Sequence, residues 1–254
     1  MSVEFEKSGH IAFITLNRPE ARNAINGETA SGIERALDAY EADSQLWVAI
    51  LTGSGTVFCA GADLKEIAAG NVRRLRTERG GFAGLVQRQR SKPLIAAING
   101  AAVAGGLELV LACDMAIASD TAVFGLPEVK RSLVAGAGGV FRLPRAIGKS
   151  MAMEMILTGD TIDASRAEGL GLINKAVPAD ELLTEARSLA ERIVSSAPLA
   201  VQTSRSVAER AHIDDDETLW RASAEASRAI MQTEDFAEGP RAFIEKRAPV
   251  WKGK

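Results

Sequence analysis

Two glutamates stand where a carboxylate is unusual, and they are the residues that point most directly to chemistry. Glu108 lies among Leu107, Leu109 and Val110, just after a pair of glycines. Glu128 follows further along the chain, directly after a proline. Burying a lone carboxylate is costly, so each is expected to pair with another group or to act in catalysis. Two glutamates in one dry pocket can divide proton transfer, one accepting a proton while the other donates one.

The stretch 93–114 is expected to position Glu108. An apolar run bounded by Pro93 and Asn99 predicts a buried strand, and Gly105-Gly106 then precedes an apolar helical run. Unpaired N–H groups at such a helix start gather partial positive charge, so the junction can hold an anion or an oxyanion. Junctions of this kind occur in most α/β proteins, however, and a helix dipole alone favours an acidic residue there. The stretch 93–114 therefore indicates a functional site only if a second stretch of the chain supplies partner groups for it.

A second junction of the same kind comes earlier in the chain. A predicted buried strand over 46–52 and a short apolar run over 57–59 lead into the small residues of Ala60–Glu66. Two such junctions side by side could aim two backbone N–H groups at one carbonyl oxygen, which is the geometry of an oxyanion hole. A third small-residue turn, Gly136–Gly139, precedes another helix. The charged segment Asn71–Ser91 is expected to form a mobile helix and loop over the site.

The remaining patterns predict a mixed α/β fold followed by a helical last third. The other predicted elements are a hairpin over 3–7 and 11–16, a helix over 28–42 capped by Asn26, strands over 115–119 and 172–177, and helices over 150–157 and 164–168. From Asp180 to the end the apolar spacing is helical, with breaks expected at Pro198, at 214–216 and at Gly239-Pro240.

The helical last third carries more apolar surface than one α/β core needs. Leu219, Trp220, Ile230 and Met231 look exposed, and such a surplus commonly marks an interface between subunits. The alternative is that these helices fold back on their own subunit.

Composition bounds the class of protein. The chain has 254 residues, of which 46% are hydrophobic and 25% charged, so it can bury one sizeable core with room for a small appended piece. Its net charge of -3 gives no overall basic field, which argues against nucleic acid as a partner. No signal peptide and no apolar stretch of membrane-spanning length is evident, so we expect a cytoplasmic protein without a membrane partner.

The sequence lacks the residues that several other kinds of catalytic or binding site require. His10 and His212 do not lie at ligand spacing, so no metal site is expected. Cys59 and Cys113 make no disulfide framework, have no base beside them, and are expected to be small core residues. No phosphate loop or dinucleotide fingerprint occurs. What remains is two carboxylates and up to two oxyanion-stabilising amides, which suits proton transfer or water addition next to an activated carbonyl.

Several segments together resemble the crotonase superfamily, and specifically its enoyl-CoA hydratases. The segments that carry the likeness are 58–66 (FCAGADLKE), 98–109 (INGAAVAGGLEL), 124–129 (FGLPEV), 136–139 (GAGG), 17–19 (NRP) and 242–247 (AFIEKR). The likeness extends over nearly the whole chain, and these segments follow one another along it in the family's order. The resemblance implies a ββα spiral catalytic core over 1–195 and a C-terminal helical trimerisation region over 196–254. It also implies homotrimers, or hexamers made of two trimers.

The resemblance further implies a role for each matching residue. The N–H groups of Ala62 and Gly105 would bind the thioester oxygen of an acyl-CoA substrate. Glu108 and Glu128 would hold the catalytic water between them, and Gly136 would orient it. Coenzyme A is part of the substrate, and no separate cofactor is implied. The positions that match coenzyme A contacts are Ala60, Asp63, Leu64 and Lys65 in one loop, and Phe243 and Lys246 on a terminal helix that reaches a neighbouring subunit.

The expected activity is that of an enoyl-CoA hydratase, which adds water reversibly to a 2-enoyl-CoA. Segments 80–85 and 238–254 are also similar to carnitinyl-CoA dehydratases, so the acyl group stays open. A double-bond isomerase is a further alternative, although isomerases commonly keep only one of the two acids. A catalytically silent relative that binds acyl-CoA or RNA has no need of both. Ala104 stands where many relatives have glycine, which should be tolerable because Gly105 supplies the amide.

Overall fold

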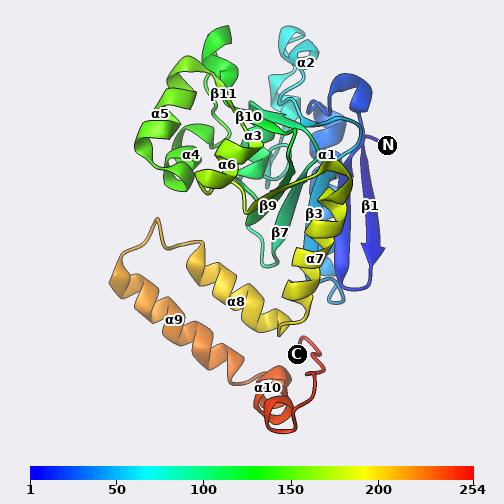
Figure 1. Cartoon of the computed structure of the whole chain (residues 1–254), viewed down its shortest axis with the longest axis vertical. Helices are drawn as coiled ribbons and strands as arrows, with labels where there is room; N and C mark the ends of the chain where they lie inside the picture. The colour runs from blue at the N-terminus through cyan, green and yellow to red at the C-terminus, as the bar shows by residue number, and fades with distance from the viewer.

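The computed structural model describes residues 1–254, and a six-stranded sheet lies at its centre (Figure 1). In spatial order its strands are β1 (Val3–Ser8), β2 (Ile11–Leu16), β3 (Val48–Gly53), β7 (Leu94–Ile98), β9 (Met115–Ser119) and β12 (Lys175–Val177). The pair β1 and β2 is the predicted antiparallel hairpin, and every later pair is parallel. Parallel neighbours need crossover connections, which the helices and a second sheet provide.

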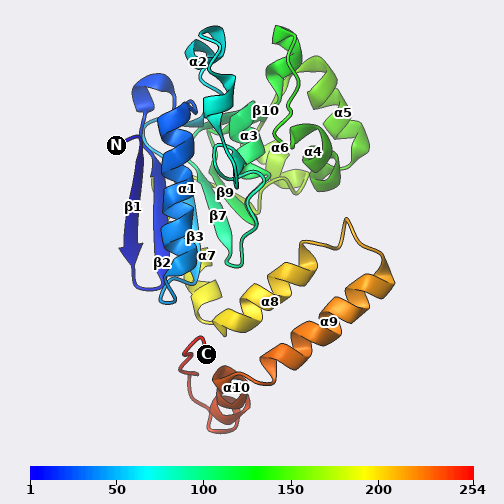
Figure 2. The ribbon, with the colours of Figure 1, turned by 180° about the vertical axis from the view of Figure 1, so that it is seen from behind.

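Helices cover both faces of this sheet, α1 (Gly27–Ala42) on one and α7 (Leu182–Val194) on the other (Figures 1 and 2). Within β3, Leu51 belongs to the core that includes α1, whereas its neighbour Ile50 belongs to the core that includes α7. Because both faces are buried, the central strands are continuous apolar runs and not alternating ones. This explains why the apolar runs predicted these strands correctly.

The smaller sheet gives the fold its spiral. Its strands in spatial order are β11 (Thr161–Asp163), β10 (Val123–Gly125), β8 (Ala101–Val103) and β4 (Val57–Cys59). The chain passes from the large sheet to the small one in the pairs β3 and β4, β7 and β8, and β9 and β10. Each pair is followed by a helical segment, respectively α2 (Leu64–Ala68), α3 (Gly105–Val110) and the 3-10 helix η3 (Pro127–Arg131). This repeated unit is the predicted ββα spiral, and it brings the carboxyl ends of β4, β8 and β10 to one edge.

Most of the other predicted elements are present. The helices after the third glycine turn are α4 (Gly139–Ile147), α5 (Lys149–Thr158) and α6 (Ala164–Gly169). Asn26 caps α1, since its Oδ1 accepts a hydrogen bond from the N–H of Thr29 at 2.8 Å. The strand predicted over 172–177 is shorter, because Leu172 and Ile173 are buried in a turn before β12 begins.

The helix expected within Asn71–Ser91 is wrong. The segment contains the 3-10 helix η2 (Val72–Leu75), the two-residue strands β5 (Arg76–Thr77) and β6 (Gly81–Phe82), and turns. Gly81, Ala83 and Gly84 have φ angles of 65°, 56° and 67°. A right-handed helix cannot pass through residues in this left-handed region.

The last third forms a helical arm that extends away from both sheets (Figures 1 and 2). Its helices are α8 (Pro198–Ala208), α9 (Asp216–Ile230) and α10 (Glu234–Ile244). The predicted breaks at Pro198 and at 214–216 are confirmed, since Pro198 begins α8 and Asp215 caps α9. The predicted division after residue 195 falls in the turn between α7 and α8.

The break expected at Gly239-Pro240 is wrong, because α10 continues through Pro240. Two carboxylates of α10 fix the helix against the end of the chain instead. Glu238 accepts a hydrogen bond from the N–H of Val250 at 2.8 Å, and Asp235 accepts one from the N–H of Lys252 at 2.8 Å. These tertiary contacts oppose the helix-breaking effect of an internal proline.

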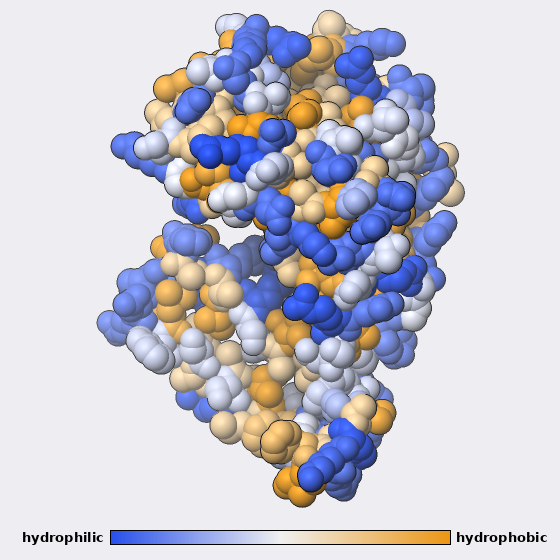
Figure 3. Space-filling model, in the orientation of Figure 1, coloured by the Kyte–Doolittle hydropathy of each residue, from blue (hydrophilic) through white to orange (hydrophobic).

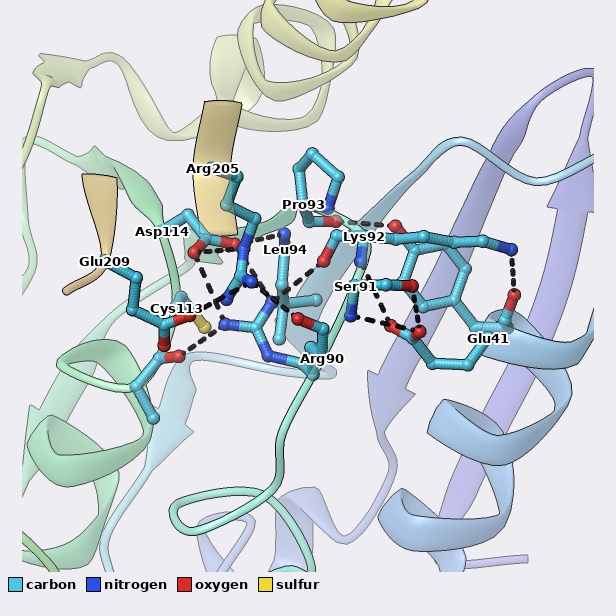
Figure 4. A network of polar contacts seen from close by, with 12 residues as sticks. Glu41, Arg90, Ser91, Lys92, Pro93, Leu94, Cys113, Asp114, Arg205 and Glu209 are labelled. Atoms are coloured by element: carbon cyan, nitrogen blue, oxygen red, sulfur yellow. Dashed lines mark hydrogen bonds and ion pairs between the residues drawn. The ribbon is translucent and has the colours of Figure 1, made fainter. Parts of the chain in front are cut away.

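A buried charge cluster fixes the base of the arm to the core (Figure 4). Arg205 of α8 donates to Asp114, just after α3, at 2.8 Å and to the carbonyl oxygen of Arg90 at 2.6 Å. Arg90 donates to the other carboxylate oxygen of Asp114 at 2.9 Å. The side chains of Arg90 and Arg205 are 3% and 9% exposed, so this contact is largely shielded from water.

Beyond that base the arm presents apolar side chains to solvent (Figure 3). Trp220, Phe243 and Ile244 are 76%, 85% and 78% exposed, and Met231 is 56% exposed. The predicted exposure therefore holds for Trp220 and Met231, whereas Leu219 and Ile230 are half-buried. None of the helices has both the length and the apolar character needed to cross a bilayer.

Candidate active site

The carboxyl ends of β4, β8 and β10 surround a cavity of about 510 Å³. Its lining combines two acids, the small residues of the glycine junctions, apolar side chains and three arginines. The lining includes Ala60, Ala62, Leu64, Phe82, Gln87, Gly105, Glu108, Glu128, Val134 and Gly136, with Arg22, Arg76 and Arg131. The two predicted catalytic acids and the two predicted oxyanion-hole residues thus share one cavity.

The loops that carry Ala62 and Gly105 are in direct contact. A Cβ atom added to Gly61 would lie 2.8 Å from the nitrogen of Gly105, so only glycine allows this approach. Ile25 holds the first loop, because its N–H donates to Gly61 and its carbonyl oxygen accepts from Asp63. No acceptor within the chain binds the N–H of Ala62 or of Gly105. Two adjacent backbone donors therefore stay available to one oxygen atom.

Ala104 adopts a strained backbone to start α3. Its φ and ψ angles are 52° and -129°, in a region that residues with a side chain rarely adopt. Its N–H is held by the carbonyl oxygen of Gly125 at 2.9 Å, which fixes the turn. The fold accommodates alanine here, as expected, but at the cost of backbone strain next to the Gly105 amide.

Glu108 is deeply buried and is held by the third glycine turn. Its side chain lies in α3, the residue is 4% exposed, and Oε1 accepts a hydrogen bond from the N–H of Gly139 at 2.9 Å. Burial raises the pKa of Glu108, while the N–H of Gly139 opposes that rise by stabilising the ionised form. The segment 136–139, recognised from its glycines, thus supplies a donor to the acid.

Glu128 lies in η3 in a different electrostatic setting. Burial raises its pKa to about 7, and the charge of Glu108 adds to this effect. Its own backbone N–H and Arg131 act in the opposite direction. Its Oε2 atom is buried without a hydrogen-bond partner. Glu128 therefore retains a proton in a pH range where an ordinary glutamate is ionised.

Phe82 is a site residue that was not predicted. Its ring atoms lie 2.6 Å from the place where a side chain on Gly105 would begin, so the ring packs directly on the loop that carries Gly105. In the sequence, segment 80–85 is notable only for its similarity to carnitinyl-CoA dehydratases. Aromatic rings in short hairpins give no local signal of the element on which they pack, so the contact became visible only in three dimensions.

Only some of the residues predicted to contact coenzyme A line the cavity. Ala60 and Leu64 line the cavity, whereas Lys65 is exposed and does not. Asp63 caps α2, accepting from the N–H of Lys65 at 3.1 Å, and it pairs with Arg18 at 3.1 Å. Its carboxylate therefore shapes the loop.

The other two residues predicted to contact coenzyme A lie away from the cavity of their own chain. Phe243 and Lys246 are exposed at the end of α10, on the arm and away from α2 and α3 (Figure 1). Gly136 lines the cavity, but its N–H donates to the carbonyl oxygen of Val134 at 2.7 Å. Its role in orienting water stays a prediction.

The cysteines lie in the core, as predicted. Cys59 is buried and Cys113 packs against the same core, and burial raises the pKa of each thiol to about 12. A thiol with so high a pKa is a poor nucleophile. No cluster of three or more His, Cys, Asp or Glu residues has the arrangement of a metal site.

Comparison with known proteins agrees with this geometry. Residues 6–254 match the family model described as enoyl-CoA hydratase/isomerase. The chain is 43% identical to a mevalonyl-coenzyme A hydratase of Aspergillus fumigatus, over 96% of this chain and 92% of that protein. It is 41% identical to a carnitinyl-CoA dehydratase of Proteus mirabilis, over 100% and 99% of the two chains.

A solved structure extends the likeness to the whole fold. The crystal structure of an enoyl-CoA hydratase from Mycobacterium tuberculosis is similar with a TM-score of 0.95 and 42% identity, covering 100% of this chain and 99% of that one. The match of sequence and fold along the full length shows that the chain belongs to the enoyl-CoA hydratase/isomerase family of the crotonase superfamily.

Proposed function

We propose that this protein is an enoyl-CoA hydratase that adds water across the 2,3 double bond of a 2-enoyl-CoA to give a 3-hydroxyacyl-CoA. The observation that carries the proposal is the meeting of Glu108, Glu128 and the free N–H groups of Ala62 and Gly105 at one cavity. The protein acts on an acyl-CoA thioester, and the two hydratase or dehydratase relatives support water chemistry.

The roles follow from the charges around each group. The N–H groups of Ala62 and Gly105 donate to the thioester oxygen, where negative charge develops as the enolate forms. Glu108, ionised with the help of Gly139, removes a proton from water while the water oxygen bonds to C3. Glu128, whose pKa lies at about 7, donates its proton to C2. Glu108 is then protonated and Glu128 ionised, and exchange of one proton each with solvent restores the starting state. Reversal of the steps is dehydration.

Both acids favour hydration over the alternatives. An isomerase has to move one proton between two carbons, for which a single carboxyl group is sufficient. A silent acyl-CoA binder has no use for a buried carboxyl oxygen without a partner, as in Glu128. A carnitinyl-CoA dehydratase would use the same groups on another acyl chain.

The proposal includes assembly into a homotrimer or a hexamer. The exposed apolar residues of the arm, such as Trp220, support it, because apolar helical surface of this kind commonly lies between subunits. Phe243 and Lys246 would then contact coenzyme A in a neighbouring subunit. The free thiols of Cys59 and Cys113 support a reducing, cytoplasmic setting.

The direct test is product analysis with crotonyl-CoA. We expect the conjugated thioester absorbance to fall and the product to be 3-hydroxybutyryl-CoA, with one solvent deuteron at C2 when the reaction runs in D₂O. With 3-hexenoyl-CoA, formation of the 2-enoyl isomer faster than hydration of crotonyl-CoA would instead show an isomerase. Binding of crotonyl-CoA without any product would show a silent binder.

A further inference from the structure

The cavity carries positive charge that its acids do not neutralise. Arg76 and Arg131 both line it, and neither forms an ion pair with any carboxylate of the chain. Arg22, the third arginine of the lining, also forms no ion pair, whereas Arg18 and Arg88, which do not line the cavity, pair with Asp63 and Asp38. A guanidinium group without a partner is a donor available to a ligand.

Neighbouring residues fix the direction in which the Arg76 side chain points. It lies opposite Phe82 in the β5 and β6 hairpin, and directly opposed residues project from the same face. Because the Phe82 ring packs on Gly105, the Arg76 side chain also emerges on the cavity side. Its Nη2 atom lies 3.5 Å from Oε1 of Gln87, whose side chain is packed against Gly81. A neutral amide therefore supports the guanidinium and leaves its charge uncompensated.

Arg131 reaches the cavity from a different element. It ends η3, the 3-10 helix that carries Glu128, and its charge lowers the pKa of Glu128 only as a minor opposing effect. It forms no hydrogen bond to Glu128, whose Oε2 atom stays without a partner. The guanidinium group therefore does not serve as the structural partner of the acid beside it.

The expected orientation of the acyl-CoA substrate places Arg76 and Arg131 at the end of the cavity that would hold the acyl chain. Ala60 and Leu64 would take the coenzyme A portion, and Arg22 lies on that side, since its carbonyl oxygen accepts from the N–H of Ala60 at 3.1 Å. The thioester oxygen lies at the Ala62 and Gly105 amides. The acyl chain beyond C3 therefore passes Glu128 and reaches the remaining lining, which includes Arg76 and Arg131.

We propose that the enoyl group of the substrate ends in a carboxylate, which Arg76 and Arg131 bind. This inference rests on the proposed hydratase function and narrows its substrate class. A quaternary ammonium group, as in a carnitinyl chain, needs a carboxylate or aromatic faces around it. Phe82 is the one aromatic residue in the lining, and the catalytic pair supplies its only acids. This cavity therefore repels the cationic acyl group that the names of several relatives indicate.

Three 2-enoyl-CoA substrates that differ in terminal charge test the proposal. These are crotonyl-CoA, which is neutral, glutaconyl-CoA, which ends in a carboxylate, and crotonobetainyl-CoA, which ends in trimethylammonium. Since a charge-assisted hydrogen bond is worth enough for roughly a tenfold preference, kcat/KM is expected to be about tenfold higher for glutaconyl-CoA than for crotonyl-CoA. It should be lowest for crotonobetainyl-CoA. A preference for the trimethylammonium substrate, or none among the three, overturns the proposal.

Single substitutions identify the groups responsible. Arg76→Gln and Arg131→Gln should each reduce the ratio of kcat/KM for glutaconyl-CoA over crotonyl-CoA by about fivefold to tenfold. Arg73→Gln is the matched control, because Arg73 lies in η2 close to Arg76 in the chain but does not line the cavity. The control should leave the ratio unchanged. Equal losses with both substrates would show that the arginines bind coenzyme A phosphates, and would overturn the acyl assignment.

Measurements of substrate affinity test this inference independently of the hydratase proposal. Calorimetry with the Glu108→Gln variant measures affinity for the three thioesters while turnover is slowed by at least about 10²-fold. Tighter binding of glutaconyl-CoA, lost in the double variant with Arg131→Gln, supports the acyl assignment even if the wild-type protein hydrates none of the three. Equal affinities overturn it even if crotonyl-CoA is hydrated rapidly.

Discussion

The backbone N–H of Gly139 donates a hydrogen bond of 2.9 Å to Oε1 of Glu108, and this bond joins the start of α4 to the acid of α3. Glu128 has no comparable donor at Oε2. Burial raises the pKa of both acids. At Glu108 the N–H of Gly139 opposes that rise, whereas at Glu128 only its own backbone N–H and the charge of Arg131 oppose it, and the charge of Glu108 raises the pKa further. The two acids thus differ in protonation because of their donors, which is the difference that a base and an acid in one reaction require.

Each acid is expected to be essential. Glu108→Gln and Glu128→Gln should each lower kcat by at least about 10²-fold, since that is the usual effect of losing a general acid or base. KM should change much less. Steady-state hydration of crotonyl-CoA measures both constants, and Glu154→Gln, an exposed change on α5, serves as the control. Near-normal turnover in either variant would remove that residue from the mechanism.

Hydration should depend on the proton of Glu128. Its pKa is raised to about 7, so this proton is lost as the pH rises through that value, and kcat/KM for hydration should fall on the alkaline side. Because the raised pKa means tighter proton binding in the folded state, the same group stabilises the fold fully below the ordinary glutamate pKa, and this contribution is lost as the pH rises through about 7. The residual activity of Glu128→Gln should lack the alkaline limb. A wild-type profile that stays flat across neutrality would contradict this role.

Ala104→Gly should relieve the strain at the start of α3. Strain at such a backbone costs on the order of 1–3 kcal/mol, and the greater freedom of glycine in the unfolded chain offsets about 0.5–1 kcal/mol of the gain. We expect unfolding free energy to rise by about 1 kcal/mol in urea titration. Ala101→Gly, in β8, is the control and should be destabilising. Equal destabilisation by both would show that Ala104 is not strained.

Asp114→Ala should weaken the attachment of the arm. It leaves Arg90 buried without a carboxylate, and removing one partner of a buried pair costs about 3 kcal/mol. Hydrogen exchange should increase along α8 before it increases in the large sheet. Asp160→Ala breaks an exposed pair with Lys130 and should have little effect on either measurement. Unchanged exchange in α8 would show that other contacts hold the arm.

Lys246→Ala should raise KM for crotonyl-CoA with little change in kcat, the pattern of lost uniform binding. The reason is that Lys246 is exposed at the end of α10 and would face coenzyme A only in an assembled oligomer. Lys252→Ala is the matched control, because Lys252 is already paired with Glu234 at 2.8 Å. A monomer by light scattering that turns over normally would argue against shared sites.

The site acids could be predicted because their local surroundings are unusual. Glu108 follows a glycine pair within an apolar run, and no ordinary surface helix has that pattern. The buried strands could be predicted for a related reason, since burial on both faces removes polar residues from them. Local sequence patterns are sufficient to predict a segment when all of its residues share one environment.

The sequence could not predict features that depend on distant partners. Pro240 stays inside α10 because the helix is fixed by the end of the chain, which no local rule anticipates. The helix expected over 71–91 fails at Ala83, an alanine with a positive φ that composition does not reveal. Arg76 and Arg131 look like ordinary surface charges until the fold places both at one cavity.

The cluster of Arg90, Asp114 and Arg205 fixes the angle at which α8 leaves the core, so it is the pivot for any change in that angle. A helix of 15 residues such as α9 is about 22 Å long, so a tilt of about 5° at the pivot displaces its far end by about 2 Å. Such a displacement exceeds the tolerance of a hydrogen bond. In the proposed assembly, the position that Lys246 takes at another subunit would therefore depend on the contacts of Asp114, and a substitution there would alter a remote site without touching it.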